Sequence, residues 1–274
     1  MSLFICPVCG MALAREERTY ACPAGHRFDI ASEGYVNLLT ANQKHAKEPG
    51  DDKNMVRARS RFLSKGYYDP LLHALEALAV ELPKARPVLL DSGCGEGYYT
   101  QGIYTALDEA GKKPHVAGID ISKEAVRLAA KRLRQAEFAV ASAYRLPLAE
   151  GCADLVLNCF SPLGISEFHR ILKPDGHFFY VVPAPRHLWA LKSAVYDKPY
   201  ENEKTIAEYP GFVLQKSISV QGSIILSEKQ AILDLFTMTP YFWKTPRSGL
   251  ERLAALEALE TEIAFDVYIY RKNA

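Results

Sequence analysis

The chain has 274 residues, of which 49% are hydrophobic and 24% are charged, as is typical of a globular protein with one large domain and a small appendage. No apolar run approaches the roughly 20 residues of a membrane-spanning helix, and the N-terminus lacks the pattern of a secretory signal. We therefore expect a cytoplasmic protein with no membrane partner. The net charge of +1 excludes a global basic field as the means of attracting nucleic acid.

Four residues with metal-binding side chains lie near the N-terminus, in the pattern C-x2-C-x12-C-x3-H: Cys6, Cys9, Cys22 and His26. Two closely spaced pairs of soft or borderline ligands are what tetrahedral Zn²⁺ requires. Without a secretory context, clustered cysteines indicate a metal rather than disulfides. Because four protein ligands fill the coordination shell, we predict a structural zinc site and not a catalytic one.

The residues between the two pairs distinguish a zinc ribbon from a DNA-reading finger. A DNA-reading finger has histidine as its third ligand and an amphipathic helix before it, whereas the third ligand here is Cys22. The stretch 10–21 is typical of two short strands joined by a polar turn. We therefore predict a zinc ribbon over residues 1–35, a fold that often lies beside nucleic acid.

A basic linker is predicted over residues 36–67. Within it, residues 44–65 hold seven lysines and arginines against three acids. Arg57, Arg59 and Arg61 are two residues apart, so they would share one face of a strand but spread around a helix. Solvated charge on a helix is the alternative to a binding role.

From about residue 69, strand-like and helix-like segments alternate. Helical spacing covers 69–82, 98–110, 122–134 and 163–173, and strand patterns cover 87–91, 115–120, 137–141, 153–160 and 177–183. This alternation predicts an α/β fold with a parallel, doubly wound sheet. Ligands of such sheets bind beyond the carboxyl ends of the strands, where the glycine-rich loop after residue 91 would lie.

That loop, "DSGCGEGY", discriminates between three kinds of cofactor. A phosphate-binding P-loop needs a Lys-Ser/Thr pair, which is absent here. A dinucleotide fingerprint needs a small third residue where Tyr98 stands, and this side chain would crowd the pyrophosphate. The pattern formed by Asp91, Gly93, Gly95 and Gly97 resembles motif I of the class I S-adenosylmethionine-dependent methyltransferases.

The methyltransferase resemblance implies several roles. In that family the acid at the strand end faces the amino-acid part of the cofactor, and the glycines admit the cofactor to the backbone. Asp120, which ends the next strand, matches the acid that binds the ribose hydroxyls. Ser142 would lie near the adenine, where the family often has aspartate. A Rossmann-like sheet of seven strands, the last one antiparallel, is implied over residues 68–274.

Longer motifs narrow the family. The segments "FDIASEGYVNLL" (28–39), "EPGDDKNMVRARSRFLSKGYYDPL" (48–71), "PRHL" (185–188) and "MTPYFWK" (238–244) resemble the bacterial 23S rRNA (guanine-N1)-methyltransferases, and the resemblance runs over nearly the whole chain. It implies transfer of a methyl group from S-adenosylmethionine to N1 of a guanine in a 23S rRNA hairpin beside the peptide exit tunnel.

The resemblance also implies a set of site residues. Those expected to bind the cofactor are Tyr68, Asp91, Gly93, Gly95, Glu96, Gly97, Asp120, Ser142 and His187. RNA binding is expected at the ribbon and at Arg57, Arg59 and Arg61. N1 of guanine is protonated and a poor nucleophile, so the site must favour the deprotonated base. No catalytic base is assigned, and the candidates near the sheet edge are Asn158, Arg186 and His187.

Several alternatives stay open. The acceptor of the methyl group is a small molecule or a protein in one of them. In another, the chain is an RNA-binding adaptor without activity. The sequence does not identify the target guanine or show a link to macrolide resistance. It also leaves the oligomeric state open, with a homodimer as one alternative.

Overall fold

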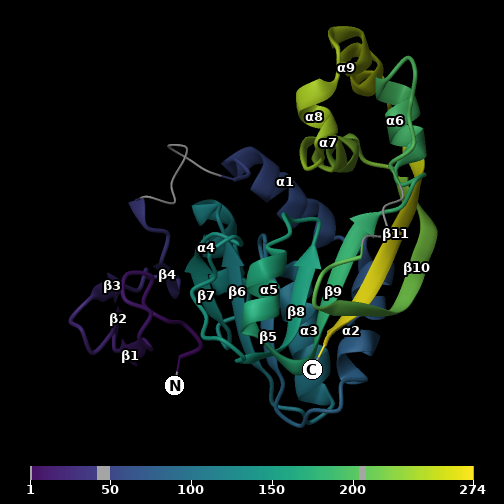
Figure 1. Cartoon of the computed structure of the whole chain (residues 1–274). Coiled ribbons are helices and arrows are strands. Elements are labelled where there is room, and N and C mark those ends of the chain that lie inside the picture. Colours follow the sequence, from purple (N-terminus) through teal and green to yellow (C-terminus); the bar gives the residue numbers. More distant parts are fainter. Residues whose placement is uncertain (1, 42–49, 204–207, 274) are drawn as a thin grey trace.

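The computed structural model describes residues 2–41, 50–203 and 208–273. Within them, one mixed sheet of eight strands forms the centre of the molecule, in the order β10-β11-β9-β8-β5-β6-β7-β4 (Figure 1). Its strands are β4 (Tyr35–Asn37), β5 (Val88–Ser92), β6 (His115–Asp120), β7 (Glu137–Val140), β8 (Ala153–Cys159), β9 (Leu172–Pro183), β10 (Phe212–Leu226) and β11 (Leu259–Lys272).

The helices divide into a group around the sheet and a group beyond it. Those around the sheet are α1 (Lys53–Leu63), α2 (Asp69–Val80), α3 (Tyr98–Glu109), α4 (Lys123–Arg132) and α5 (Ile165–Ile171). Those beyond it, which we call the cap, are α6 (Trp189–Val195), α7 (Lys229–Thr237), α8 (Tyr241–Lys244) and α9 (Arg247–Ala254). In the part of the chain that is described, no helix is both long and apolar enough to cross a membrane.

The strand pairing confirms the doubly wound sheet and adds one strand to the seven expected. Strands β4 to β9 pair in parallel, and β11 runs antiparallel to both of its neighbours, as expected of the last strand. The strand beyond the seven expected is β4, whose Tyr35 pairs with Phe138 of β7. Strand β4 includes residue 35, at which the ribbon is predicted to end. The domain boundaries stay a prediction.

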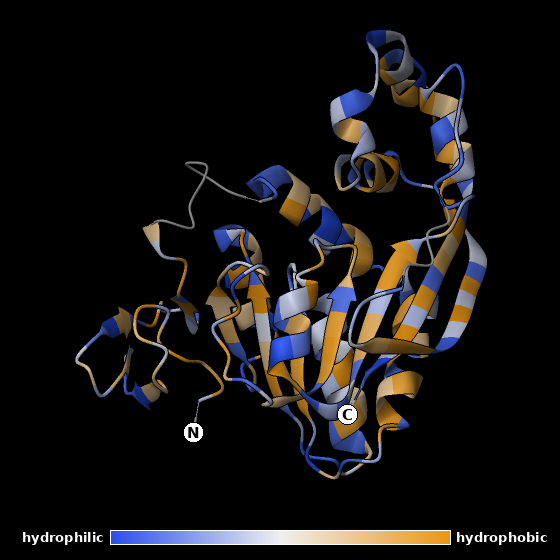
Figure 2. Cartoon of the chain, in the orientation of Figure 1, coloured by the Kyte–Doolittle hydropathy of each residue, from blue (hydrophilic) through white to orange (hydrophobic). Residues whose placement is uncertain are grey.

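Apolar side chains alternate between the two faces of the sheet, and each face has its own core. Leu89 and Leu155 pack with α2, α3 and α4 on one face. Leu90 and Val156 pack on the other face with α5 and the N-terminal residues. This alternation follows from the twofold repeat of a strand. Figure 2 shows the result, with largely hydrophobic strands between helices that carry polar outer surfaces.

The N-terminal ribbon is a small antiparallel sheet of β1 (Ala14–Glu16), β2 (Thr19–Ala21) and β3 (Arg27–Asp29). The first two strands lie in the stretch where two were predicted. A carboxylate of β7 contributes polar contacts between the ribbon and the central sheet. Glu137 accepts hydrogen bonds from Ser2 Oγ at 2.5 Å and Tyr20 OH at 2.9 Å, and its other oxygen lies 2.9 Å from Nε2 of His115.

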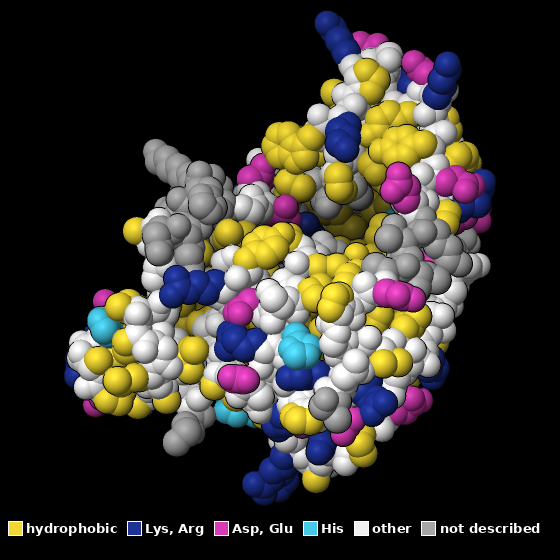
Figure 3. Space-filling model, viewed as in Figure 1, with side chains coloured by type: hydrophobic (Ala, Val, Ile, Leu, Met, Phe, Trp, Pro, Cys, Tyr) yellow, Lys and Arg dark blue, Asp and Glu magenta, His cyan; other side chains and the backbone are white. Residues whose placement is uncertain are grey.

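Helix α1 lies within residues 36–67, the predicted basic linker, and packs against α4 and α7. Asp52 begins it, because its side chain accepts hydrogen bonds from the backbone N–H groups of Asn54 and Met55. The cap helices lie beyond the carboxyl ends of the strands (Figure 1). Figure 3 shows a hollow between cap and sheet with hydrophobic side chains on its walls.

Candidate functional site

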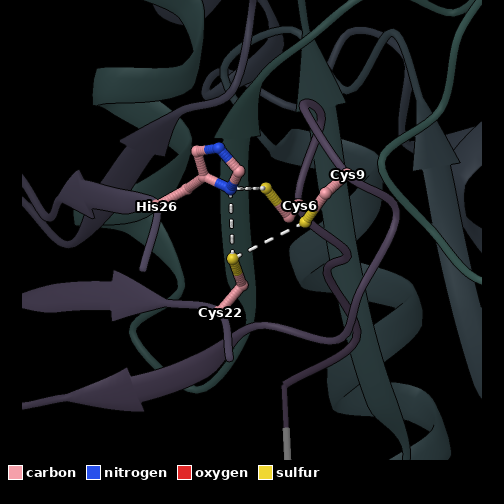
Figure 4. Close-up of side chains that lie close together, drawn as sticks. All are labelled: Cys6, Cys9, Cys22 and His26. Atoms are coloured by element: carbon pink, nitrogen blue, oxygen red, sulfur yellow. Dashed lines mark hydrogen bonds between the residues drawn. The ribbon is translucent and has the colours of Figure 1, made fainter. Parts of the chain in front are cut away.

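The four predicted metal ligands come together at one end of the ribbon (Figure 4). Sγ of Cys22 lies 3.3 Å from Nδ1 of His26 and 3.6 Å from Sγ of Cys9, and Sγ of Cys6 lies 3.6 Å from the same ring nitrogen. A tetrahedral zinc ion with bonds of about 2.0–2.3 Å requires ligand atoms about 3.3–3.8 Å apart. The spacing of the side chains therefore suits a zinc ion.

Two tight turns aim these side chains at a common point. The N–H of Gly10 donates to the carbonyl of Cys6 at 2.8 Å, and the N–H of Gly25 donates to the carbonyl of Cys22 at 2.9 Å. Both glycines have positive φ, of 75° and 86°, which other residues rarely adopt. Burial raises the pKa of the Cys22 thiol, but hydrogen bonds with His26 lower it to about 6, which favours the thiolate that binds metal.

Asp91 is the penultimate residue of the central strand β5 and is almost fully buried. One of its oxygens accepts a hydrogen bond from Thr100 Oγ1 at 2.5 Å, while Oδ1 has no partner among the described residues. Burial raises the pKa of this carboxyl to about 7. A buried carboxylate with a free oxygen suits a cationic group, such as the ammonium of S-adenosylmethionine.

The loop after Asp91 has three glycines with positive φ: Gly93, Gly95 and Gly97, at 83°, 55° and 82°. A Cβ on Gly93 would lie 2.3 Å from Cβ of Ser161, and one on Gly97 would lie 3.0 Å from Ala129. These two glycines therefore allow close packing of the loop. A Cβ on Gly95 would meet only a guanidinium nitrogen of α1, at 3.7 Å, so the space over Gly95 is the most open.

Asp120 fastens this loop to the end of β6. Its two carboxylate oxygens accept hydrogen bonds from the N–H of Gly95 at 3.0 Å and of Ser122 at 2.8 Å. Burial raises the pKa of Asp120. Each carboxylate oxygen has a second lone pair that suits a ribose hydroxyl. Ser142 lies after the neighbouring strand, where its hydroxyl accepts from the N–H of Tyr144 at 3.2 Å.

Glu96 is buried behind the same loop. Burial raises the pKa of its carboxyl, and the positive charge of Arg59 lowers it. Its Oε1 has no hydrogen-bond partner in the described part of the chain. The carboxyl of Glu96 thus lies inside the protein near α1.

Tyr68 and His187 form a buried pair, with the hydroxyl 3.2 Å from Nε2 of the ring. The N–H of Ala264 donates to Nδ1 of His187 at 3.2 Å. Burial lowers the pKa of His187 to about 3, so the ring is neutral and carries its proton on Nε2. Both ring nitrogens are therefore engaged, which leaves His187 without a free position to act as a base.

The other two candidate catalytic residues have structural partners. Asn158 is fully buried at the end of β8, and its Nδ2 donates to Ser161 Oγ at 2.6 Å and to the carbonyl of Pro162 at 3.1 Å. Arg186 is exposed, with its guanidinium 4.4 Å from the ring centre of Trp189. Their arrangement brings Asn158, but not Arg186, into the buried part of the site.

The arginines of α1 spread around a helix, and each forms an ion pair: Arg57 with Glu124, Arg59 with Asp51, and Arg61 with Asp234. The ion pair of Arg61 is bidentate, with distances of 3.0 and 2.5 Å. Arg59 lies over the glycine loop, among the charges of Asp51, Glu96 and Asp120. The three side chains therefore attach α1 to neighbouring parts of the protein.

A second basic cluster is formed by residues that no sequence motif indicates. Arg15, Arg18 and Arg134 line a cavity of about 420 Å³ between the ribbon and α4, together with Glu17 and Glu33. None of these three arginines forms an ion pair with a described residue. The cluster is difficult to find from sequence because Arg134 lies more than a hundred residues after Arg15 and Arg18.

The comparisons with known proteins agree with this geometry. Residues 4–47 match the family model described as "RlmA, N-terminal", a zinc ribbon, and residues 84–234 match a methyltransferase domain. BH2331 of Bacillus halodurans C-125, provisionally titled a methyltransferase, has the same fold. It is 15% identical with a TM-score of 0.50 over 74% of this chain and 99% of its own.

Two named relatives have higher sequence identity to this chain. YxjB of Bacillus subtilis strain 168, provisionally named a 23S rRNA (guanine-N(1)-)-methyltransferase, is 32% identical over 99% of this chain and 98% of its own. The 23S rRNA (guanine(748)-N(1))-methyltransferase of Streptomyces fradiae is 36% identical over 69% of this chain and 66% of its own. The chain therefore belongs to the 23S rRNA (guanine-N(1)-)-methyltransferase family, and it combines a zinc ribbon with an S-adenosylmethionine-dependent methyltransferase fold.

Proposed function

We propose that this enzyme methylates N1 of one guanine in a hairpin of 23S rRNA beside the peptide exit tunnel. One observation carries the proposal. A ribbon that suits zinc and a buried carboxylate that suits a cationic cofactor occur in a chain that aligns with YxjB over almost its full length. In a bacterial cell, an rRNA substrate is consistent with the cytoplasmic location predicted from the sequence.

The cofactor is held along the carboxyl edge of β5, β6 and β7. Asp91 binds the ammonium of the methionine part, and Asp120 binds the ribose hydroxyls with the lone pairs that the backbone leaves free. The open backbone at Gly95 gives the cofactor room. When bound, S-adenosylmethionine supplies the methyl group on a positively charged sulfur.

The Tyr68–His187 pair contributes a fixed hydrogen-bond donor. Because Nε2 of His187 donates to the Tyr68 oxygen, the hydroxyl proton of Tyr68 remains available. Burial raises the pKa of Tyr68 far above neutrality, so this proton is retained. A neutral O–H donor suits the carboxylate of the cofactor, and the sequence resemblance implies that Tyr68 lines the cofactor pocket.

Alignment is the main catalytic contribution that the site supports. N1 of guanine reacts well only after it loses its proton, and His187 has no free nitrogen to accept that proton. Holding the acceptor nitrogen in line with the methyl group lowers the entropic part of the barrier. Asn158 acts by positioning, because its amide fixes the turn beside the glycine loop.

The rRNA contacts the ribbon and the arginine cluster next to it. Arg15, Arg18 and Arg134 have no acidic partner among the described residues and border a cavity, so they suit phosphate groups. The arginines of α1 stay candidates for RNA contact, but each already neutralises a carboxylate.

The test is methyl transfer from labelled S-adenosylmethionine to protein-free 23S rRNA, with 16S rRNA as the control. Primer extension then locates the product, because a methyl group on N1 blocks Watson–Crick pairing and stops the polymerase. A single stop in 23S rRNA, absent in a strain without the enzyme, is the expected result. Label in metabolites or protein and none in rRNA would favour another acceptor. Absence of cofactor binding would favour an adaptor.

A further inference from the structure

Phe160 stands out among the residues at the carboxyl edge of the sheet. It directly follows β8 and has a φ of 55°, a left-handed conformation that aromatic residues rarely adopt. Its side chain is 46% exposed although it lies next to the buried end of a central strand. A strained backbone that presents an apolar ring to solvent points to a function for that ring.

The surrounding residues hold this strained turn in place. Ser161 Oγ donates to the carbonyl of Ser92 at 2.6 Å, and Asn158 Nδ2 donates to the same hydroxyl. Gly93 leaves the space that Ser161 fills. The N–H of Phe160 donates to the carbonyl of Val181 at 3.2 Å. The position of Phe160 is thus coupled to the glycine loop.

The ring of Phe160 is the exposed member of a cluster of four rings that has Phe265 at its centre. Its centre lies 5.6 Å from that of Phe265, which lies 4.6 Å from His187 and 4.9 Å from Tyr68. The other three rings are buried. The cluster therefore reaches from the buried site to the protein surface at the carboxyl end of β8.

The sheet topology places this ring beside the substrate position. Strand order reverses at β5, since β6 lies on one side of it and β8 on the other. Doubly wound sheets bind their ligands beyond this switch point. Asp91 lies on the β5 side of the switch point and Phe160 follows β8 on the other. A planar acceptor would meet the exposed ring there.

We propose that Phe160 stacks on the target guanine and holds it for the reaction, an inference that rests on the proposed function. Bases in RNA loops are commonly displaced from the stack and bound against aromatic side chains. The ring orients the acceptor, while Asp91 and Asp120 hold the cofactor. Phe160 is a positioning residue and takes no part in proton transfer.

The experiment compares Phe160→Asn, Phe160→Tyr and Phe160→Trp with the wild type on protein-free 23S rRNA. Asparagine tolerates positive φ, so this variant removes the ring without adding backbone strain. Stacking predicts that kcat of the asparagine variant falls about 10- to 100-fold. Its KM for rRNA, affinity for S-adenosylmethionine and Tm should stay close to the wild-type values. The tyrosine and tryptophan variants should retain activity.

Each other outcome overturns the inference. Activity of Phe160→Asn within about twofold of the wild type would show that the ring is not needed. An equal loss in all three variants, or weaker cofactor binding, would assign Phe160 to the glycine loop instead. A loss found only on substitution of the exposed Trp243 would place the guanine on the cap. If wild-type protein leaves rRNA unmethylated but binds S-adenosylmethionine, the proposed function fails, and this inference fails with it.

Discussion

The ribbon and the central sheet position their functional side chains by different means. Strands of three residues form the ribbon, and β1 is exposed along its whole length. Its four ligands therefore depend on two glycine turns and on a metal ion. In contrast, the sheet buries Asp91 between two apolar layers, and its loop is held by hydrogen bonds to Asp120. The metal-dependent region and the burial-dependent region should thus respond to different perturbations.

Removal of zinc should have the largest effect and should be confined to the ribbon. Metal binding supplies folding free energy on the order of 10 kcal/mol to such a segment. We expect chelation, or Cys22→Ser, to expose residues 2–34 to proteolysis and abolish rRNA methylation, while calorimetry shows almost unchanged cofactor affinity. Cys152→Ser, outside the ligand set, is the matched control. A ribbon that remains protected without metal would break the comparison.

Asp120→Ala should affect the sheet region and leave the ribbon intact. The substitution removes the acceptor for the ribose hydroxyls and for the N–H of Gly95. We expect affinity for S-adenosylmethionine to fall roughly 10- to 100-fold without unfolding, as measured by calorimetry. Asp108→Ala, at an exposed position of α3, controls for loss of charge. An unchanged affinity would contradict the assignment of the ribose to Asp120.

The burial of Asp91 should make both stability and cofactor binding depend on pH, in opposite directions. Burial raises its pKa from 3.8 to about 7, and the nearby charges of Asp120 and Glu96 add to this shift. The folded protein therefore binds the Asp91 proton more tightly than the unfolded chain does. The stability that this proton contributes is complete below pH 4 and is lost as the pH rises to 7. Cofactor binding needs the charged form, so affinity should fall about tenfold per pH unit below 7.

Asp91→Asn provides the control for this pH dependence. The amide does not titrate. Between pH 5.5 and 7.5, the Tm from thermal melts and the cofactor affinity from calorimetry should therefore lose the pH dependence that Asp91 causes in the wild type. Zinc binding by the ribbon should follow its own pH dependence, which is the same in both proteins. Identical pH profiles of cofactor affinity in wild type and variant would place the ammonium elsewhere.

The smallest expected effect separates the two groups of arginines. Neutralising Arg15, Arg18 and Arg134 to glutamine should weaken rRNA binding uniformly and lower its salt dependence by about one unit of slope for each arginine. The matched variant is Arg57→Gln on α1, whose guanidinium already pairs with Glu124. Its salt dependence should hardly change. Filter binding at several salt concentrations measures both, and the reverse order would favour α1 as the RNA surface.

Local patterns predicted the regular elements of the sheet well. The predicted strand 115–120 coincides with β6, and the predicted helix 98–110 ends one residue after α3. Strand β9 begins at Leu172, five residues before the predicted start, because Leu172 pairs with Ala153 across a register shift. The motif residues Asp91, Asp120, Tyr68 and His187 were all named from sequence.

Features that depend on distant parts of the chain were not predictable in the same way. Strand β4 is recognised as part of the sheet only through its pairing with β7. The ion pair of Arg61 with Asp234 joins residues 173 positions apart, and no local pattern indicates it. The same holds for Phe160, whose importance lies in a φ angle and in contacts with Phe265.

Glu137 bears on the design of chimeric enzymes in which the ribbon is exchanged between relatives. This one carboxylate receives Ser2 and Tyr20 from the ribbon and lies against His115 of the central sheet. A ribbon grafted from another member of the family would keep these polar contacts with the sheet only if it brought equivalent donors to this side chain. Chimeric enzymes with altered rRNA preference should therefore be designed with the graft boundary beyond β4 and with Glu137 matched to the incoming ribbon.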